Sequence, residues 1–156
     1  MLPMIELKPI GYVKTTGKEI QKGNTSKIIL HEALSEALEG LQDFSHIFVI
    51  FWMHDVTDEE RSSLKTHPRG RTNMPLLGVF ATRTPHRPNP IGLTLVKLLE
   101  VEGNTLTVRG LDAFDGTPVL DLKPFDYWDA AADASVPEWW TRLEKERSEN
   151  KVAGSN

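Results

Sequence analysis

Seven short segments rich in Val, Ile, Leu, Phe and Thr constrain the fold of this chain more than any other feature. Gly, Pro, Asn and Asp separate them, a pattern typical of short strands joined by turns. Segments 93–101 and 105–109 are joined by a turn containing Gly103 and Asn104, which tolerate positive φ, so a tight antiparallel hairpin is predicted. The chain is therefore expected to be mainly β, a barrel or a sandwich, with strands at residues 5–13, 27–30, 46–53, 76–81, 93–101, 105–109 and 119–123.

Helical signals are fewer and weaker than the strand signals. In residues 31–41, apolar side chains recur at the spacing of one helix face, and residues 136–147 carry Pro137 in their first turn. Both segments are expected to be short helices that cover the sheet. Trp139 and Trp140 are expected to pack in the core.

The length of the chain fits one domain. Its 156 residues can bury a sufficient core without a disulfide or a metal. We expect this domain at residues 1–148, long loops at 15–24 and 57–71, and a disordered tail at 149–156.

Composition excludes several classes of function. The absence of cysteine excludes a disulfide framework, a thiolate zinc site and a cysteine nucleophile, and the five histidines lack metal-ligand spacing, so no metal is expected. The longest apolar run, residues 47–53, is too short to cross a bilayer, and the N-terminus lacks an export signal, which favours a cytoplasmic protein with no membrane contact. A net charge of −4 argues against a protein coated in positive charge to bind nucleic acid, so RNA binding depends on the site itself.

Residues 78–94, GVFATRTPHRPNPIGLT, contain three prolines that fix their own φ and restrict the residues before them. The loop is therefore rigid before any ligand arrives. It carries polar side chains that could meet a carboxylate, a phosphate or a base edge at little ordering cost: Arg83, His86, Arg87 and Asn89. The alternative is a structural crossover whose arginines lie in water.

Two further segments carry groups suited to chemistry. Asp115 precedes a glycine in a turn and is expected to cap its own backbone, whereas Asp112 could bind ribose hydroxyls, balance a cationic cofactor, accept a proton or simply be solvated. His54 and Asp55 follow an apolar strand and suggest acid–base chemistry, but neighbours on an extended strand point to opposite faces and need not pair. His46 is expected to satisfy a buried hydrogen bond.

Four blocks occur in a fixed order: GLQDFSH at 40–46, GVFATR at 78–83, RPNPIG at 87–92 and DGTPVLDLKP at 115–124. Over about residues 5–125 the chain resembles the TsaA/YaeB-like family. The resemblance implies a single antiparallel β-barrel of about seven short strands with a few short covering helices. It also implies an S-adenosylmethionine-dependent methyltransferase that acts as a homodimer, with the cofactor near the subunit contact. The implied reaction is methylation of the exocyclic nitrogen of threonylcarbamoyl-adenosine next to the anticodon of tRNA, here by a short form without an additional C-terminal domain.

The resemblance also assigns residues. Cofactor contacts are implied at His54, Asp55, Arg83, Leu93, Arg109, Gly110, Leu111 and Asp112. In the first long loop, where the family has a ProArgGln-type motif, this chain has Gln-Lys-Gly, which makes Lys22 and Gly23 further candidates. Asp112 or His54 is expected to accept the proton, and the substrate is expected to contact His86, Arg87 and Asn89.

Two alternatives remain open at this point. The same cofactor site could serve a small metabolite, or the chain could be a non-catalytic S-adenosylmethionine-binding regulatory module.

Overall fold

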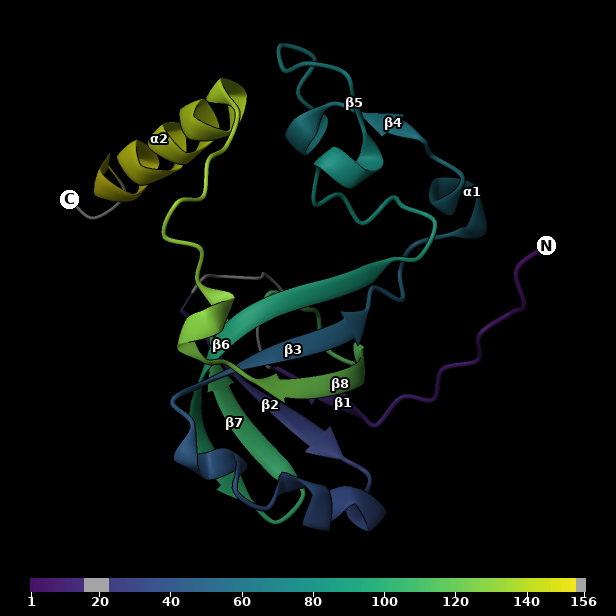
Figure 1. The fold of residues 1–156 in the computed structure, drawn as a ribbon, viewed down its shortest axis with the longest axis vertical. Helices are drawn as coiled ribbons and strands as arrows, with labels where there is room; N and C mark the ends of the chain where they lie inside the picture. The colour runs from purple at the N-terminus through teal and green to yellow at the C-terminus, as the bar shows by residue number, and fades with distance from the viewer. Residues whose placement is uncertain (16–22, 154–156) are drawn as a thin grey trace.

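The computed structural model describes residues 1–15 and 23–153, and Figure 1 shows a barrel with a second layer above it. Six strands close the barrel in the order β1-β2-β7-β6-β3-β8, and every neighbouring pair is antiparallel. The predicted mainly β, antiparallel barrel is confirmed. Its strands are β1 (Gly11–Lys14), β2 (Thr25–Leu30), β3 (His46–Trp52), β6 (Ile91–Glu102), β7 (Thr105–Arg109) and β8 (Pro118–Pro124).

Two strand predictions were wrong. Residues 76–81 do not join the barrel, because only Leu77–Gly78 (β5) is extended, pairing with Lys65–Thr66 (β4) in a separate two-stranded sheet. The chain then turns into a 3₁₀ helix, η4 (Val79–Ala81). In residues 5–13 only the end, from Gly11, forms a strand, although Ile10 before it still donates a hydrogen bond to the carbonyl of Val119 and accepts one from the N–H of His31.

The core fills the inside of the barrel through an alternation of side chains that is regular in β3 and β7 and interrupted in β6 and β8. In β3 the residues Ile47, Val49 and Phe51 face inward, while the residues between them lie on the outer face. β7 shows the same alternation, with Leu106 and Val108 fully buried. Full burial of such side chains stabilises the fold by about 1.5–3 kcal/mol each. The inward-facing residues therefore stabilise the closed barrel.

Gly92, the last residue of the RPNPIG block, allows one close contact inside the barrel. It lies opposite Phe51 in the β3–β6 pairing. A Cβ on Gly92 would lie 2.2 Å from two atoms of the Phe51 ring. The glycine is thus required by the packing of an aromatic side chain.

The predicted covering helices differ from those observed. The single helix predicted at residues 31–41 is replaced by two 3₁₀ helices, η1 (Glu32–Leu38) and η2 (Leu41–Asp43), because Gly40 at φ 88° interrupts the helix between them. The C-terminal helix α2 (Glu138–Ala153) continues beyond residue 147 and occupies most of the segment expected to be a disordered tail. The loop predicted at residues 57–71 contains α1 (Asp58–Arg61), β4 and a 3₁₀ turn, η3 (Pro68–Gly70).

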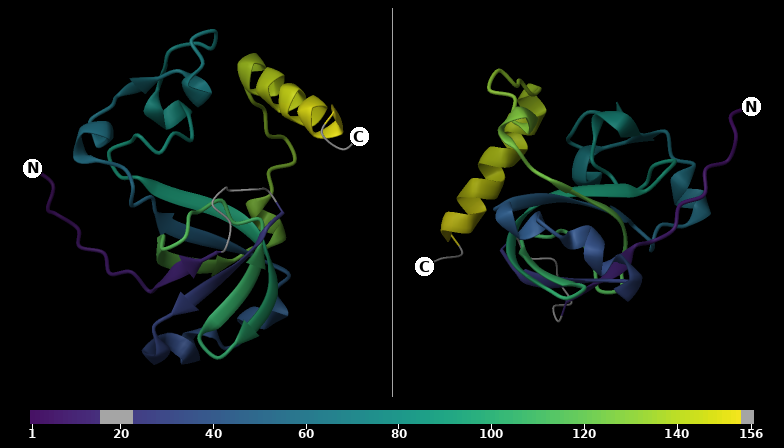
Figure 2. Two further views of the ribbon diagram at one scale, coloured as in Figure 1. Left: turned by 180° about the vertical axis from the view of Figure 1, so that it is seen from behind. Right: turned by 60° about the horizontal axis from the view of Figure 1, so that its bottom comes forward.

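The second layer lies over one side of the barrel and consists of α2 and the segment from α1 to β5 (Figures 1 and 2). The right-hand view of Figure 2 looks into the barrel and shows this layer outside it. No helix among the described residues has both the length and the apolar character needed to cross a membrane.

Candidate functional site

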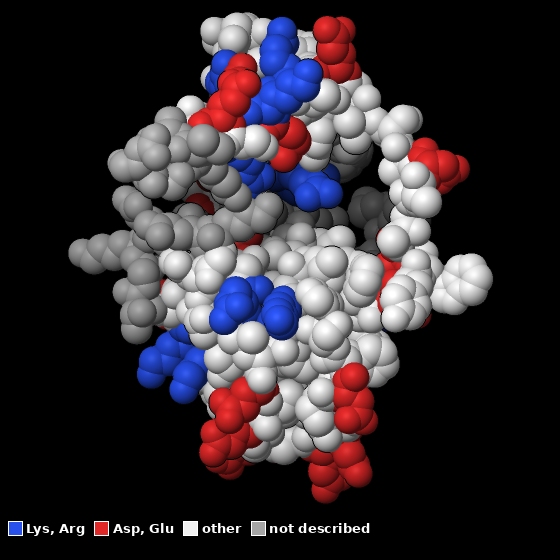
Figure 3. All heavy atoms as spheres, turned by 90° about the vertical axis from the view of Figure 1, so that its left-hand side faces the viewer, with Lys and Arg blue, Asp and Glu red and all other residues white. Residues whose placement is uncertain are grey.

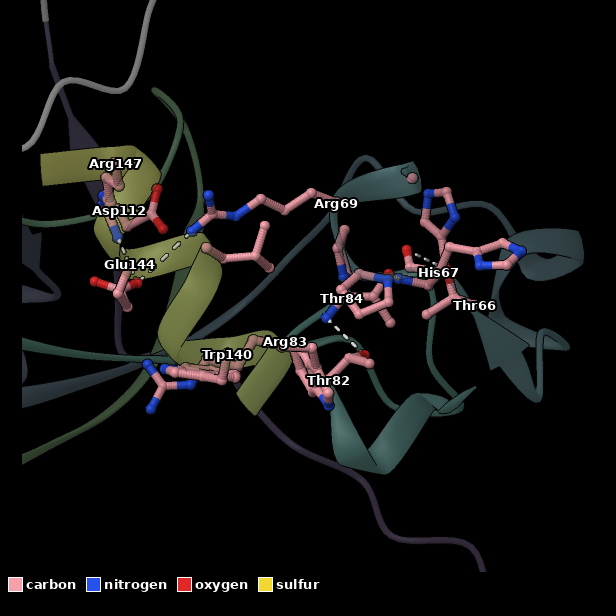
Figure 4. Close-up of a pocket in the computed structure, with 16 residues that line it drawn as sticks. Thr66, His67, Arg69, Thr82, Arg83, Thr84, Asp112, Trp140, Glu144 and Arg147 are labelled. Carbon is pink, nitrogen blue, oxygen red and sulfur yellow. Dashed lines mark hydrogen bonds and ion pairs between the residues drawn. The ribbon is translucent and has the colours of Figure 1, made fainter. Parts of the chain in front are cut away.

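A cleft of about 610 Å³ lies within the second layer. Residues 66–70 and 82–86 form one wall, α2 forms the other, and Asp112 reaches it from the loop after β7. Figure 4 shows the two walls facing each other, and Figure 3 shows Lys and Arg side chains gathered in the hollow between the barrel and the layer above it. The volume is in the range typical of sites for small molecules.

The α2 wall is held by ion pairs and by one apolar contact region. Arg69 Nη2 lies 3.7 Å from Glu144 Oε1, and Arg71 donates a hydrogen bond to Glu146. This hydrogen bond lowers the pKa of Glu146 below its usual value. Among the residues of α2 whose burial is described, 138–150, Leu143 is the buried one, so the helix packs against the segment from α1 to β5 by a narrow contact.

The prediction that Trp139 and Trp140 belong to the core was wrong. Both side chains are only partly buried and line the cleft, with ring centroids 5.5 Å apart. The reason is that α2 contacts the segment from α1 to β5, away from the barrel interior. The two rings thus provide an aromatic surface inside the cleft.

The proline-rich segment is braced as its sequence predicts. Arg61 Nε donates to the carbonyl of Pro88 at 2.9 Å, and Met53 N–H donates to the carbonyl of Pro90 at 2.8 Å. Arg87 Nη1 donates to the carbonyls of Thr82 and Thr84, at 3.2 and 3.3 Å. Arg87 therefore holds the loop in shape.

Arg83 and His86 project from this braced loop into the cleft lining. The Arg83 guanidinium lies 5.5 Å from the centroid of the Trp140 ring, a cation–π contact across the cleft. His86 Nε2 lies 3.4 Å from Glu60 Oε1. Hydrogen bonds from the backbone and the side chain of Thr57, which caps α1, lower the pKa of Glu60. Glu60 is therefore an anion at neutral pH and orients His86.

The cleft carries more positive than negative side chains. Arginines from three different segments line it, against two carboxylates: Arg69, Arg83 and Arg147 with Asp112 and Glu144. In a chain whose net charge is −4, this local excess of positive charge favours an anionic ligand group.

His54 and Asp55 pair with each other, a contact that strand alternation alone left open. His54 Nε2 lies 3.4 Å from Asp55 Oδ1 because the two residues occupy a turn after β3 and not the strand itself. They do not line the cleft. Trp52 pairs with Ile91 and Arg109 pairs with Lys97, so the His54 end of the barrel is separated from Arg109 by roughly 20 Å along β6.

The remaining predicted contacts are dispersed. Leu93 points outward on β6 and is 62% exposed, and Arg109 is exposed at the end of β7. Leu111 is 4% exposed in the barrel core, so it can offer only backbone groups, and the N–H of Gly110 already donates to Asn24 O at 3.0 Å. Of the predicted site residues that the structure describes, a single chain therefore brings only Arg83, His86 and Asp112 together in the cleft lining. Asn89 is exposed outside the cleft lining, Gly23 is exposed with φ 103°, and Lys22 lies outside the described residues.

Two structural roles can be compared with their predictions. Asp115 Oδ1 accepts a hydrogen bond from the backbone N–H of Thr15, so it caps the end of β1 instead of its own turn. His46 Nδ1 pairs with the Ser45 hydroxyl at 2.7 Å in an exposed position, so the expected buried hydrogen bond was wrong.

Sequence reasoning missed the walls contributed by residues 66–70 and by α2. Arg69 has φ 54°, and among the described residues it is the one non-glycine residue with positive φ, a conformation that often marks a functional site. His67 Nδ1 pairs with the carbonyl of Met74 at 2.8 Å and fixes this turn. The sequence signal that could have found this wall is His-Pro-Arg-Gly at 67–70, in a loop without periodicity.

Comparison with known proteins adds three findings. The family model of the tRNA-methyltransferase O N-terminal domain matches residues 16–130. An S-adenosyl-L-methionine-binding protein of Archaeoglobus fulgidus is 42% identical over 127 residues, covering 76% of this chain and 88% of that protein. A tRNA (adenine(37)-N6)-methyltransferase of Mus musculus is 43% identical over 121 residues, covering 76% of this chain and 27% of that protein.

The fold also matches a solved structure. A crystal structure of TrmO from Pseudomonas aeruginosa has a TM-score of 0.68 and 35% identity, covering 85% of this chain and 62% of that one. The present chain therefore spans less than two thirds of that protein. Helix α2, with its cleft wall, lies outside the residues that the family model matches.

Proposed function

Because the chain belongs to the family of the tRNA-methyltransferase O N-terminal domain, we propose that it is an S-adenosylmethionine-dependent tRNA methyltransferase. Its substrate is the exocyclic nitrogen of threonylcarbamoyl-adenosine next to the anticodon, and the enzyme works in the cytoplasm, where tRNA is available. The observation that carries this proposal is the convergence of Arg83 and Asp112 on one cleft of about 610 Å³.

The side chains that line the cleft fit the chemical groups of S-adenosylmethionine. The Arg83 guanidinium can bind the carboxylate of the methionine portion with two parallel hydrogen bonds. The carboxylates of Asp112 and Glu144 suit ribose hydroxyls or the positive sulfonium, and the rings of Trp139 and Trp140 suit a planar base. We therefore assign the cofactor to this cleft.

The residues of the chain have two tasks in the reaction. S-adenosylmethionine, when bound, supplies a methyl group on a very good leaving group, so alignment of the accepting nitrogen contributes most of the rate enhancement. The braced loop orients His86 toward the substrate, and Arg87 supports that loop from within. Asp112 accepts the proton that leaves the nitrogen, because it lies in the cleft lining and His54 does not.

The exposed position of Leu93 supports a homodimer. Ile91, Leu93 and Leu95 form an apolar strip on the outer face of β6, next to the outer residues of β3. Such a strip is suited to a second copy of the chain, and pairing there would cover Leu93 and the nearby His54 and Asp55. This arrangement would place three predicted contacts, Leu93, His54 and Asp55, at the subunit contact, and none of them lines the cleft to which the cofactor is assigned.

The expected mass in solution is that of two chains. Sedimentation equilibrium should give about twice the 17.6 kDa of the single chain. A mass of one chain at micromolar concentration would contradict the homodimer.

Two measurements test the function against its alternatives. Titration calorimetry should detect binding of S-adenosylmethionine, and its absence would reject any methyltransferase. Nucleosides from tRNA of a strain lacking this protein should contain less methylated threonylcarbamoyl-adenosine than wild-type tRNA. Binding of the cofactor with an unchanged nucleoside profile would instead favour a small-metabolite substrate or a regulatory module.

Replacing Arg83 with alanine should weaken S-adenosylmethionine binding roughly 10- to 100-fold. A hydrogen bond to a charged group contributes about 1.5–3 kcal/mol, and about 1.4 kcal/mol corresponds to tenfold in affinity. Titration calorimetry measures the change. Arg83→Lys, which keeps the charge without the planar fork, should recover only part of the loss, and equal affinity in wild type and Arg83→Ala would reject this contact.

A further inference from the structure

A row of four basic side chains crosses the outer face of the barrel. Lys97 on β6 lies directly opposite Arg109 on β7, and Lys14 on β1 lies directly opposite Lys27 on β2. All four side chains are exposed. We propose that this basic row binds the sugar–phosphate backbone of the RNA substrate, an inference that rests on the proposed function.

The strand register joins the two pairs into one line. Arg109 lies opposite Thr25, and Lys27 follows Thr25 by two residues on the same face of β2. Arg109 and Lys27 are therefore diagonal neighbours. Because adjacent strands lie about 4.8 Å apart, the row crosses four neighbouring strands, β6, β7, β2 and β1, over about 15 Å.

The row is electrostatically unfavourable for the free protein. Like charges directly opposite each other across a strand pair are destabilising, and the row contains two such pairs. In the part of the chain that the structure describes, none of the four side chains has an ion-pair partner within 4.0 Å. The chain as a whole is acidic, so the concentration of positive charge here is not a consequence of composition. An external polyanion would relieve this repulsion.

The position of the row points to RNA as that polyanion. Arg109 lies three residues before Asp112, which lines the cleft. The row therefore passes close to the proposed active site. Figure 3 shows Lys and Arg side chains on the barrel face below the hollow. A base held in the cleft would place its flanking phosphates over this face. Phosphate contacts of this kind fix position without reading sequence.

The test is a triple variant, Lys14→Gln with Lys27→Gln and Lys97→Gln. Arg109 stays unchanged because it is also a predicted cofactor contact. The affinity for a transcribed tRNA, measured by filter binding without cofactor, should fall about 10-fold or more at 100 mM salt. The slope of log K against log salt should decrease by about one for each lost phosphate contact. Under saturating tRNA, kcat should stay near wild type while KM for tRNA rises.

A control variant removes the same charge elsewhere: Lys8→Gln with Lys123→Gln and Lys145→Gln, all exposed and outside the row. It should bind tRNA within about twofold of wild type if local position rather than net charge matters. Circular dichroism should show the row variant folded and at least as heat-stable as wild type, since two repulsive pairs are removed.

The outcomes separate this inference from the proposed function. If the row variant binds tRNA as tightly as wild type while wild type methylates tRNA, the inference is wrong and the function stands. If wild type neither binds S-adenosylmethionine nor methylates tRNA, the function fails, whatever the salt slope shows. Row-dependent binding to vesicles containing phosphatidylserine, without binding to tRNA, would overturn the inference in favour of a membrane surface.

Discussion

Replacing Asp112 with asparagine should lower kcat about 100-fold or more while changing the affinity for S-adenosylmethionine by no more than about threefold. The substitution keeps the size of the side chain and its ability to accept a hydrogen bond, but it removes the basic oxygen. A positioned general base typically contributes 10²- to 10⁴-fold to the rate, and the carbamoylated nitrogen must lose its proton during transfer. The effect should therefore appear in turnover more than in binding.

Single-turnover kinetics with saturating cofactor and tRNA measure this effect directly. His54→Asn is the matched comparison, because His54 was the other predicted proton acceptor and lies outside the cleft lining. We expect its kcat to remain within about threefold of wild type. The reverse ranking of the two variants would move the proton acceptor to His54, and equal activity of both variants with wild type would reject the assigned site.

Replacing Gly92 with alanine should destabilise the fold by about 3 kcal/mol, near the upper end for overpacking of a core. The added methyl group would lie 2.2 Å from the Phe51 ring. Phe51 is buried within the barrel and cannot turn outward, so the backbone of β3 or β6 has to move. Thermal unfolding should show a decrease in Tm of roughly 6–12 °C for a chain of this length.

Gly78→Ala is the control for this substitution. No atom lies within 4 Å of a Cβ built there, and its φ of −60° suits any residue. Its Tm should therefore equal or slightly exceed that of wild type. A second variant, Phe51→Leu with Gly92→Ala, should recover part of the lost stability because it shortens the side chain that clashes. If Gly92→Ala alone leaves the Tm unchanged, the contact with Phe51 does not determine the choice of glycine.

The barrel could be predicted because the residue patterns that specify its strands and turns lie within short segments of the sequence. Alternating apolar residues and a short Gly-Asn turn define the β6–β7 hairpin, which the structure confirms. The strand expected at residues 76–81 could not be excluded from sequence, since its composition suits a strand equally well. Whether a short apolar segment joins a barrel depends on an available strand edge, and here the six strands close on themselves.

The predicted residues that line the cleft come from two short motif segments, Asp112 from the loop after β7 and the others from the proline-rich loop. Arg83 and His86 come from the proline-braced segment, and both line the cleft. The opposite wall could not be predicted, because a pair of tryptophans such as Trp139 and Trp140 in a helical segment is usually part of a core. Their placement depends on contacts of α2 with residues some 75 positions earlier, such as Arg71 with Glu146. Such long-range ion pairs leave no periodic signal in the sequence.

The ion pairs that hold α2 have a consequence for every assay of this protein. Exposed pairs such as Arg69 with Glu144 are weak, and at physiological ionic strength the screening length is only about 8 Å. Added salt therefore loosens one wall of the cleft while it also weakens any contact with phosphates. The salt dependence of cofactor binding reflects both this wall and the charged contacts of the cofactor itself, and only the difference between wild type and the row variant isolates the contribution of RNA. Ionic strength thus affects this enzyme in two ways: it changes the shape of the site, and it changes the affinity for the RNA substrate.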